Sequence, residues 1–369
     1  MENYNKLTVN LEKLKNNIID LKKHCPQNQI MFMVKADAYG HGMIPIVRYS
    51  QTECEINQFG VATLDEAINI RHELPDLDNE LYVFSNLNLE ENSSLYAEMN
   101  IIPVLSSISM LDLFLKNNYL KGVPLVIKLN TGMNRLGIGQ SEVELMIDKI
   151  KSNGRNKIYH LMTHLSSSSE KMDANNKSHK QKEIFDQIIK KISSNEIIIE
   201  RTSISNSGAI EQSFGLDYSH VRPGLMLYGP SALTKDARQN SFWKGSSISS
   251  LETNILSIFS VKQGDEIGYS AEIINGNGEV VILSIGYGDG ISTKLKGAKL
   301  TINNLTAEII GRVNMDMLQL FFESGTLPFH VNDKIKLWSS DTSEILSISD
   351  KAEIIPYELY CSLTNRVIR

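Results

Sequence analysis

The chain has 369 residues, of which 41% are hydrophobic and 22% charged, a composition typical of a soluble globular enzyme. Its net charge of −6 disfavours nucleic-acid binding, and no apolar run approaches the ~20 residues that a membrane-spanning helix needs. The three cysteines, Cys25, Cys54 and Cys361, are far apart. This argues against a disulfide framework or a metal site and favours a cytoplasmic location.

Residues up to about 230 alternate short apolar runs with longer amphipathic segments. The apolar runs predict strands at Ile30–Val34, Phe59–Ala62, Leu81–Phe84, Ile101–Leu105, Leu125–Leu129, Tyr159–Met162, Ser203–Ser205 and Val221–Tyr228. The segments between them predict helices, among them Leu64–Leu74, Leu89–Met99, Met110–Asn117, Glu142–Lys151 and Ile184–Ile192. Thr63 and Glu66 form a capping-box pattern at the start of the first of these. The alternation predicts a (β/α)8 TIM-like barrel over residues 1–235.

Most predicted strands end in a polar residue, and in a barrel these ends meet at the face that carries the active site. The most informative of them is Lys35, which directly follows the apolar run Ile30–Val34. Desolvation at such a position lowers the pKa of a lysine and frees its amine to form a Schiff base. The alternative is that Lys35 ends a strand and points to solvent.

The pattern of polar and apolar residues changes after residue 235. Lys235–Ser250 is polar and indicates a linker. Strand-like runs separated by Gly and Asn-Gly turns follow at Asn254–Val261, Glu279–Ile285, Thr306–Arg312, Met317–Phe322 and Lys334–Trp338. We therefore expect a C-terminal, mostly-β domain over residues 236–369.

Several short motifs follow one another along the whole chain. They are Val34–Gly42, Lys128–Gly137, Met162–His164, Ser205–Ser207, Val221–Gly229, Ile267–Ser270, Ile285–Gly290 and Gly311–Asp316. With these motifs the chain resembles the alanine racemase family of pyridoxal-phosphate-dependent amino-acid racemases. The resemblance implies pyridoxal 5′-phosphate (PLP) as the cofactor, a small amino acid as the substrate, and a homodimer whose two active sites are shared between subunits.

The resemblance also implies which residues react. Lys35 would hold PLP covalently and act as one of two catalytic bases, because racemisation removes a proton from one face of the substrate and returns one to the other. Tyr269 of the partner subunit would be the second base, hydrogen-bonded to His164. Arg222 would contact the pyridine nitrogen, and an always-charged donor keeps that nitrogen unprotonated.

The remaining assignments concern binding. The resemblance places the PLP phosphate on a group of hydroxyls, an amide side chain and backbone amides, at Tyr39, Ser207, Asn206, Gly224 and Leu225. It places the substrate carboxylate on Arg135, whose fork suits a carboxylate, and on the backbone amide of Met315. Lys128 matches a position that is often carbamylated in this family, where the carbamate would orient Arg135. Tyr287 would line the entrance, and Asp316 would follow Met315 in a loop supplied by the partner.

One departure from the family bears on the substrate. Asn365 stands just before Arg366-Val367, where many alanine racemases carry a tyrosine that contacts the phosphate and narrows the substrate pocket. The change resembles the serine racemases of vancomycin resistance, in which the catalytic domain follows a membrane domain. The chain is then either a soluble racemase or the cytoplasmic domain of a larger membrane protein.

A pocket discriminates weakly against one extra hydroxyl, by roughly 10²-fold or less, so we expect activity on both serine and alanine, with a preference for serine. A housekeeping alanine racemase is the alternative, and either product would feed peptidoglycan precursors. A related PLP-dependent decarboxylase and a non-catalytic PLP carrier are further alternatives. The filled Arg222 and Tyr269 positions argue against the decarboxylase, and the second domain argues against the carrier.

Overall fold

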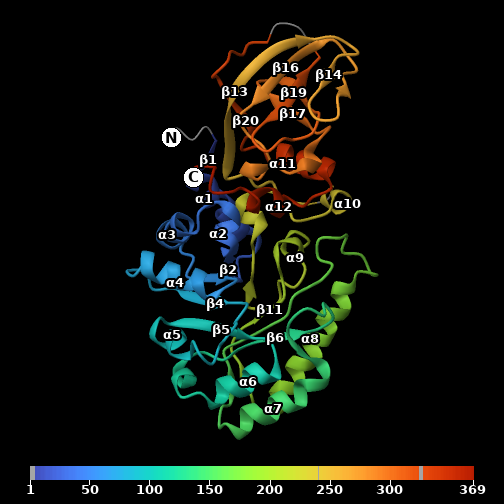
Figure 1. Ribbon diagram of the computed structural model, residues 1–369. Coiled ribbons are helices and arrows are strands. Elements are labelled where there is room, and N and C mark those ends of the chain that lie inside the picture. Colours follow the sequence, from blue (N-terminus) through green and yellow to red (C-terminus); the bar gives the residue numbers. More distant parts are fainter. Residues whose placement is uncertain (1–4, 240, 324–326) are drawn as a thin grey trace.

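The computed structural model describes residues 5–239, 241–323 and 327–369 (Figure 1). A ring of parallel strands surrounded by helices is followed by a strand-rich unit, drawn in yellow to red. The first unit confirms the predicted barrel and the second confirms the predicted mostly-β domain. Within the described ranges, no helix combines the length and the apolar character needed to cross a membrane.

The barrel strands lie in the order β12–β2–β3–β4–β5–β6–β9–β11, and all are parallel. Their bounds are β2 (Gln29–Met33), β3 (Gln58–Val61), β4 (Glu80–Val83), β5 (Ile101–Leu105), β6 (Val126–Asn130), β9 (His160–Met162), β11 (Thr202–Ser203) and β12 (His220–Val221). A bridge between Asn206 and Arg222 brings the two end strands together, so the barrel is nearly closed. Short strands β7 (Ile138–Gly139), β8 (Lys157–Ile158) and β10 (Ile198–Ile199) flank it.

The predicted strand Val221–Tyr228 is too long. Pro223 lacks the N–H that a ladder needs, and the chain leaves the barrel wall after Val221. Leu225–Tyr228 instead forms the 3-10 helix η3. This early turn brings the backbone of Gly224 to the cavity at the end of the barrel.

Helices cover the outside of the barrel: α1 (Leu11–His24), α3 (Met43–Cys54), α4 (Leu64–Glu73), α5 (Ser93–Glu98), α6 (Ile108–Lys116), α7 (Val143–Ser152) and α8 (Lys177–Ser194). The capping box of α4 is confirmed, because Thr63 Oγ1 accepts from the Glu66 N–H and Glu66 Oε2 accepts from the Thr63 N–H, both at 3.3 Å. Helix α8 is longer than predicted, because Asn176 caps it by accepting from the Ser178 N–H at 2.9 Å.

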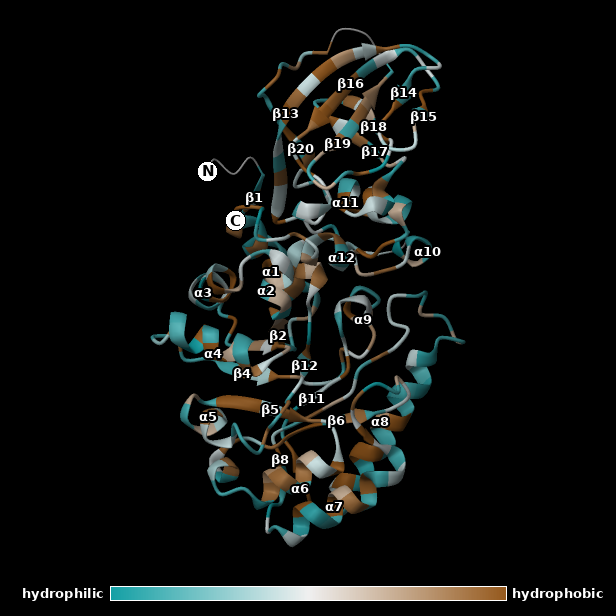
Figure 2. Ribbon diagram, viewed as in Figure 1, coloured by the Kyte–Doolittle hydropathy of each residue, from teal (hydrophilic) through white to brown (hydrophobic). Residues whose placement is uncertain are grey.

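The inside of the barrel is packed with its own apolar cluster, formed by Met31, Tyr82, Ile102, Val104, Val126 and Met162. Strand β5 is buried at every position, and Figure 2 shows it as almost uniformly apolar. A strand buried on both faces has this continuous apolar pattern. Since the interior is filled, the functional cavity lies at the carboxyl ends of the strands.

The second unit is a seven-stranded sheet. It contains β1 (Lys6–Val9), β13 (Ser249–Val261), β16 (Gly278–Leu283), β17 (Lys299–Ile302), β18 (Leu305–Ile310), β19 (Leu318–Phe322) and β20 (Lys334–Trp338), beside the small pair β14 (Glu266–Ile267) and β15 (Glu272–Ile273). Strand β1 pairs antiparallel with β13. The predicted boundary between residues 235 and 236 stays a prediction, with the refinement that Lys6–Val9 belong to the second sheet.

Three helices join the two units: α10 (Lys235–Arg238) in the predicted linker, then α11 (Thr342–Ala352) and α12 (Pro356–Cys361) near the C-terminus. Figure 1 shows α12 at the level where the barrel meets the strand-rich unit. It packs against α2 (Lys35–Gly40), the segment that carries the predicted catalytic lysine. The C-terminal helix thus returns to the active end of the barrel.

Candidate active site

Lys35 follows β2 at the start of an unusual turn. Ala36, Asp37, Ala38 and Tyr39 all have φ between 53° and 54°, which makes α2 a left-handed helical turn. Each such residue costs roughly 1–2 kcal/mol, so the surroundings must hold it. Glu66 Oε1 accepts from the Ala36 N–H at 2.6 Å, and Asp37 Oδ1 accepts from the Met43 N–H at 2.7 Å. The turn separates Lys35 from Tyr39, yet both side chains reach one cavity.

This cavity of about 490 Å³ lies at the carboxyl ends of the barrel strands. It brings together nine of the residues predicted for the site: Lys35, Tyr39, Lys128, Arg135, His164, Asn206, Ser207, Arg222 and Gly224. They come from strand β6 and from segments that follow other strands, as expected for a barrel active site. Met33, Phe84, Leu136 and Met162 add an apolar wall.

Positive charge dominates the cavity, because none of the described residues that line it is acidic. Burial, followed by the charges of Arg135, Arg222 and Lys35, lowers the pKa of Lys128 to about 8. Burial and then Arg135 also lower the pKa of Lys35. Such a cavity suits a ligand that brings phosphate and carboxylate groups.

His164 lines the same cavity, and its imidazole is held neutral. Burial is the main cause that keeps its pKa well below 6.5, and Arg222 is the next largest. A neutral imidazole can accept a hydrogen bond from a phenol. The protonation state of His164 therefore suits its predicted bond to Tyr269 of the partner subunit.

The residues predicted to hold the phosphate meet where η3 approaches α9 (Ser207–Glu211). Ser207 Oγ accepts from the Gly224 N–H at 2.9 Å, and Asn206 caps α9 by accepting from the Ala209 N–H at 3.1 Å. A Cβ added to Gly224 would lie 2.5 Å from Tyr39 Oη, so only glycine leaves this space open. The amine of Lys35 and these hydroxyl and amide groups fit PLP. Leu225 itself is fully buried, and only its backbone could contribute.

Arg222 is 4% exposed, yet no carboxylate is recorded among its described partners. Its Nη2 donates to Thr163 O at 2.5 Å, and its Nη1 donates to Ser203 Oγ. Burial lowers its pKa to about 10, so the guanidinium stays charged at neutral pH. A buried cation without a carboxylate is well suited to an acceptor on a bound ligand.

Asn365, in the C-terminal tail, is exposed and is not among the residues that line the cavity in a single chain, so its role in the substrate pocket stays a prediction. Tyr357 of α12 lines the cavity instead, and its ring centroid lies 5.5 Å from that of Tyr39. Proline at the first position of α12 was the sequence signal for a helix there. Asn365 is followed by Arg366, which pairs with Asp316 at 2.9 Å.

The structure does not bring the residues predicted for the partner's contribution into this chain's cavity. Tyr269 is 69% exposed, Met315 53% and Tyr287 46%, and Asp316 is also exposed. Ser270, directly after Tyr269, has a positive φ of 70°, so the tyrosine sits on a tight turn between β14 and β15. Within a single chain, the predicted catalytic set is therefore incomplete.

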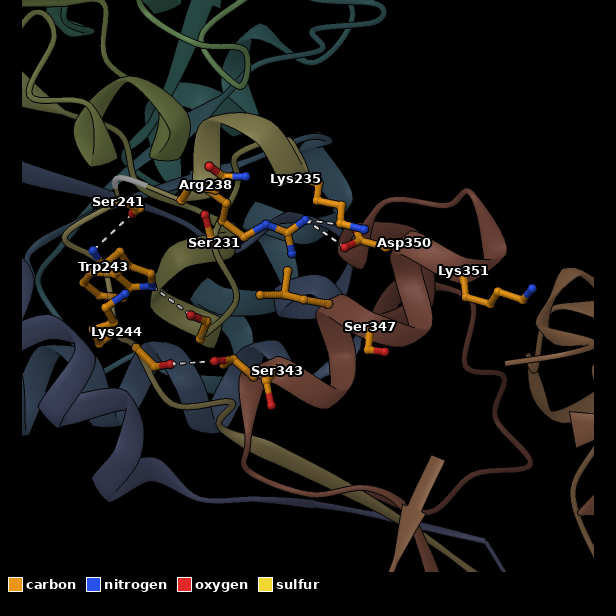
Figure 3. A pocket seen from close by; sticks show the side chains of 15 residues that line it. Ser231, Lys235, Arg238, Ser241, Trp243, Lys244, Ser343, Ser347, Asp350 and Lys351 are labelled. Atoms are coloured by element: carbon orange, nitrogen blue, oxygen red, sulfur yellow. Dashed lines mark hydrogen bonds and ion pairs between the residues drawn. The ribbon is translucent and has the colours of Figure 1, made fainter. Parts of the chain in front are cut away.

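A second cavity, of about 830 Å³, lies between the linker and α11 (Figure 3). Arg238 Nη2 pairs there with Asp350 at 2.8 and 3.2 Å, and Trp243 Nε1 donates to Gly229 O at 2.8 Å. On the barrel side, the buried Glu211 accepts from Ser231 Oγ and Ser241 Oγ. These contacts tie the linker to both units, and none of the predicted site residues takes part.

Comparison with known proteins gives the same family over both units. The model "Alanine racemase, N-terminal domain" matches residues 9–232, and "Alanine racemase, C-terminal domain" matches residues 248–369. The alanine racemase of Coxiella burnetii (strain RSA 331 / Henzerling II) is 30% identical over 368 residues, which cover 98% of this chain and 96% of that protein.

Two solved structures show the same fold. The biosynthetic alanine racemase from Pseudomonas aeruginosa has a TM-score of 0.86 at 25% identity, covering 100% of this chain and 99% of the other. The alanine racemase from Bartonella henselae, solved with covalently bound pyridoxal phosphate, has a TM-score of 0.85 at 23% identity and covers 99% of both chains.

Proposed function

Because the chain belongs to the alanine racemase family, we propose that it is a PLP-dependent racemase that interconverts L- and D-alanine. The observation that carries this proposal is the single cavity that gathers Lys35, His164, Arg222, Ser207 and Gly224. The D-alanine would supply peptidoglycan precursors.

Some residues of the chain would hold PLP, and others would transfer protons to and from the substrate. PLP, when bound, supplies the electron sink that makes the Cα proton of an amino acid acidic. Lys35 would hold it, and its lowered pKa favours a neutral amine that can take up a proton on one face. Tyr269 of the partner subunit would serve the other face, with the neutral His164 as its hydrogen-bond acceptor. Arg222 would donate to the pyridine nitrogen.

The substrate carboxylate would bind Arg135 and the backbone amide of Met315 of the partner subunit. Arg135 lines the cavity in this chain, whereas Met315 lies on the exposed surface of the strand-rich unit. A homodimer with shared sites follows from that division. The exposure of Tyr269, Tyr287 and Met315 supports it, since these large side chains are left without cover in one chain.

We rank alanine above serine. The preference for serine depended on Asn365, which is exposed and outside the cavity, while a tyrosine, Tyr357, still lines the pocket. The relatives reported above are also named as alanine racemases. We expect serine to be a minor substrate, because a hydrophobic wall rejects one hydroxyl only weakly. A carrier built from the barrel alone would lack the second segment that the family model matches.

The test incubates purified protein and PLP with L-alanine or L-serine and separates the enantiomers by chiral chromatography. We expect D-alanine to form faster than D-serine, and Tyr269→Phe to lose most racemisation. Tyr119→Phe is the matched control, because Tyr119 is 63% exposed and precedes β6, at the opposite end of that strand from the cavity. Release of carbon dioxide without D-alanine, or a fully active Tyr269→Phe protein, would overturn the proposal.

A further inference from the structure

We propose that Ser203, His160 and His220 form a hydrogen-bond relay inside the barrel that fixes the orientation of the Arg222 guanidinium. Ser203 and His160 are then positioning residues for the cofactor-facing arginine. The inference rests on the proposed function, since it concerns how Arg222 meets PLP.

The four side chains lie next to one another in the barrel wall. His160 opens β9, Ser203 closes β11, and His220 opens β12, just before Arg222. His160 and Ser203 are fully buried, and His220 and Arg222 are 3% and 4% exposed. Their polar atoms must therefore find partners inside the protein.

The available donors and acceptors determine the direction of the hydrogen bonds from Arg222 to Ser203 and from Ser203 to His160. Arg222 has only donors, so Ser203 Oγ accepts from Nη1. The other recorded partner of the Ser203 hydroxyl among the described residues is His160 Nε2, at 2.9 Å. Ser203 therefore donates its own proton to Nε2, which places the proton of a neutral His160 on Nδ1.

The far end of the relay can be assigned in the same way. Ser219 Oγ donates to Thr202 O at 3.1 Å, so the 2.8 Å contact between Ser219 Oγ and His220 Nδ1 makes that nitrogen the donor. His220 Nε2 is then an acceptor. Each imidazole thus carries its single proton on Nδ1.

These assignments explain two otherwise unsatisfied atoms. His160 Nδ1 and His220 Nε2 are both buried and have no partner among the described residues. The first is now a donor and the second an acceptor, and the two ring centroids are 4.9 Å apart. A direct contact after a small ring rotation, or one bridging water, satisfies both atoms at once.

Charge supports a neutral relay. Burial is the main cause that lowers the pKa of His220 to about 4, and the charge of Arg201 is the next largest. Arg222 lowers this pKa further, whereas Glu80 raises it. Burial and His220 hold the pKa of His160 well below 6.5. Two neutral imidazoles leave Arg222 as the only charge of the relay, next to the cavity. Without Ser203, the guanidinium would keep its Nη2 contacts with Thr163 O and Ile204 O and could turn about them.

The test measures the affinity of the apoprotein for PLP by the absorbance of the bound cofactor. Ser203→Ala should weaken PLP binding by roughly 3- to 10-fold, because the freed guanidinium would have to be ordered when PLP binds. It should also lower kcat for alanine more than it raises KM. Ser50→Ala is the matched control, because Ser50 is fully buried and its hydroxyl has no recorded partner.

A double-mutant cycle tests the relay itself. His160→Phe should weaken PLP binding in the same direction, and adding it to Ser203→Ala should change little more, because both break one chain of bonds. His160→Gln, which keeps an acceptor, should recover part of the affinity. Thermal melting of each apoprotein shows that it is folded.

The outcomes separate the two proposals. If the wild-type protein neither binds PLP nor racemises alanine, the proposed function fails. If the wild-type protein does both and Ser203→Ala binds PLP as tightly as wild type, the relay is wrong. Additive effects of the two substitutions would also overturn it, since independent residues would then account for both losses.

Discussion

Lys128 is the residue whose chemistry depends most on its neighbours. With a pKa of about 8, roughly a tenth of its side chains are neutral at pH 7, and the share rises as the pH increases. A neutral amine adds carbon dioxide and releases a proton to give a carbamate anion, which reverses the charge beside Arg135. We therefore predict that Lys128 is carbamylated in bicarbonate buffer at pH 8.

Labelled bicarbonate and carbon NMR provide the measurement, with Lys128→Arg as the control that cannot react. The carbamate signal should appear in the wild type alone and fade below pH 7, as protons compete for the amine. Lys128→Ala should raise KM for alanine about 10-fold, because Arg135 loses the anion that orients it. An unmodified amine at pH 8 in saturating bicarbonate would refute the prediction.

The C-terminal tail offers a second prediction at the scale of single residues. Asn365→Tyr should leave the ratio of serine to alanine turnover unchanged, because residue 365 is exposed and outside the cavity. Tyr357→Ala should raise that ratio, by no more than ~10²-fold, since it removes a ring from the wall. Steady-state rates of each variant on both substrates test these expectations. A selective loss of serine turnover in Asn365→Tyr would show that residue 365 shapes the substrate pocket.

Residues near strand ends could be predicted from the sequence, whereas Tyr357 could not. Lys35, His164 and Asn206 follow short apolar runs, so the barrel rule alone brings them together. Tyr357 reaches the same cavity because α12 returns to pack on α2, and no local pattern encodes that long-range contact. The role of Asn365 in the substrate pocket stays a prediction.

At the scale of elements, the left-handed turn α2 stores strain next to the catalytic lysine. Ala36 is exposed and has a φ of 53°, a region where a Cβ is penalised and glycine is not. Ala36→Gly should therefore raise the free energy of unfolding by up to about 1 kcal/mol. Ala97→Gly, in the right-handed helix α5, should instead lower the free energy of unfolding by about 0.5–1 kcal/mol.

Urea denaturation of the two apoproteins measures both effects. Equal destabilisation by the two glycines would mean that α2 is not left-handed in solution. The sequence Ala-Asp-Ala-Tyr does not predict this left-handed turn, because alanine and tyrosine rarely adopt a positive φ. The conformation is imposed from outside, through the Glu66 carboxylate on the Ala36 N–H and the Asp37 carboxylate on the Met43 N–H.

Other elements were predicted where local patterns dominate. The strand Ile101–Leu105, the strand Lys334–Trp338 and the capping box of α4 all agree with the structure. Helices α10, α11 and α12 were missed, because the expected β-rich texture and a polar linker masked them. Their stability comes from packing between the two units, which a local reading cannot detect.

At the scale of the whole molecule, both ends of the chain join the strand-rich unit. Lys6–Val9 pair with β13, and the Leu7 N–H donates to Ile368 O at 2.7 Å. The barrel is thus joined to the strand-rich unit before α1 and again through the linker, and α12 packs on α2 between them. Motion of one unit against the other within a chain is restrained, so we expect the shared site to be completed by association of two chains.

Subunit complementation tests this completion. Lys35→Ala and Tyr269→Phe should each be inactive, and a mixture allowed to exchange subunits should regain roughly a quarter of wild-type activity, because half of the dimers are hybrids with one intact site. A mixture of Lys35→Ala with Arg222→Ala should stay inactive, since both residues line one cavity of the same chain and each hybrid site keeps one defect. If exchange is demonstrated and the first mixture does not recover, or if both mixtures recover alike, Tyr269 does not act across the interface.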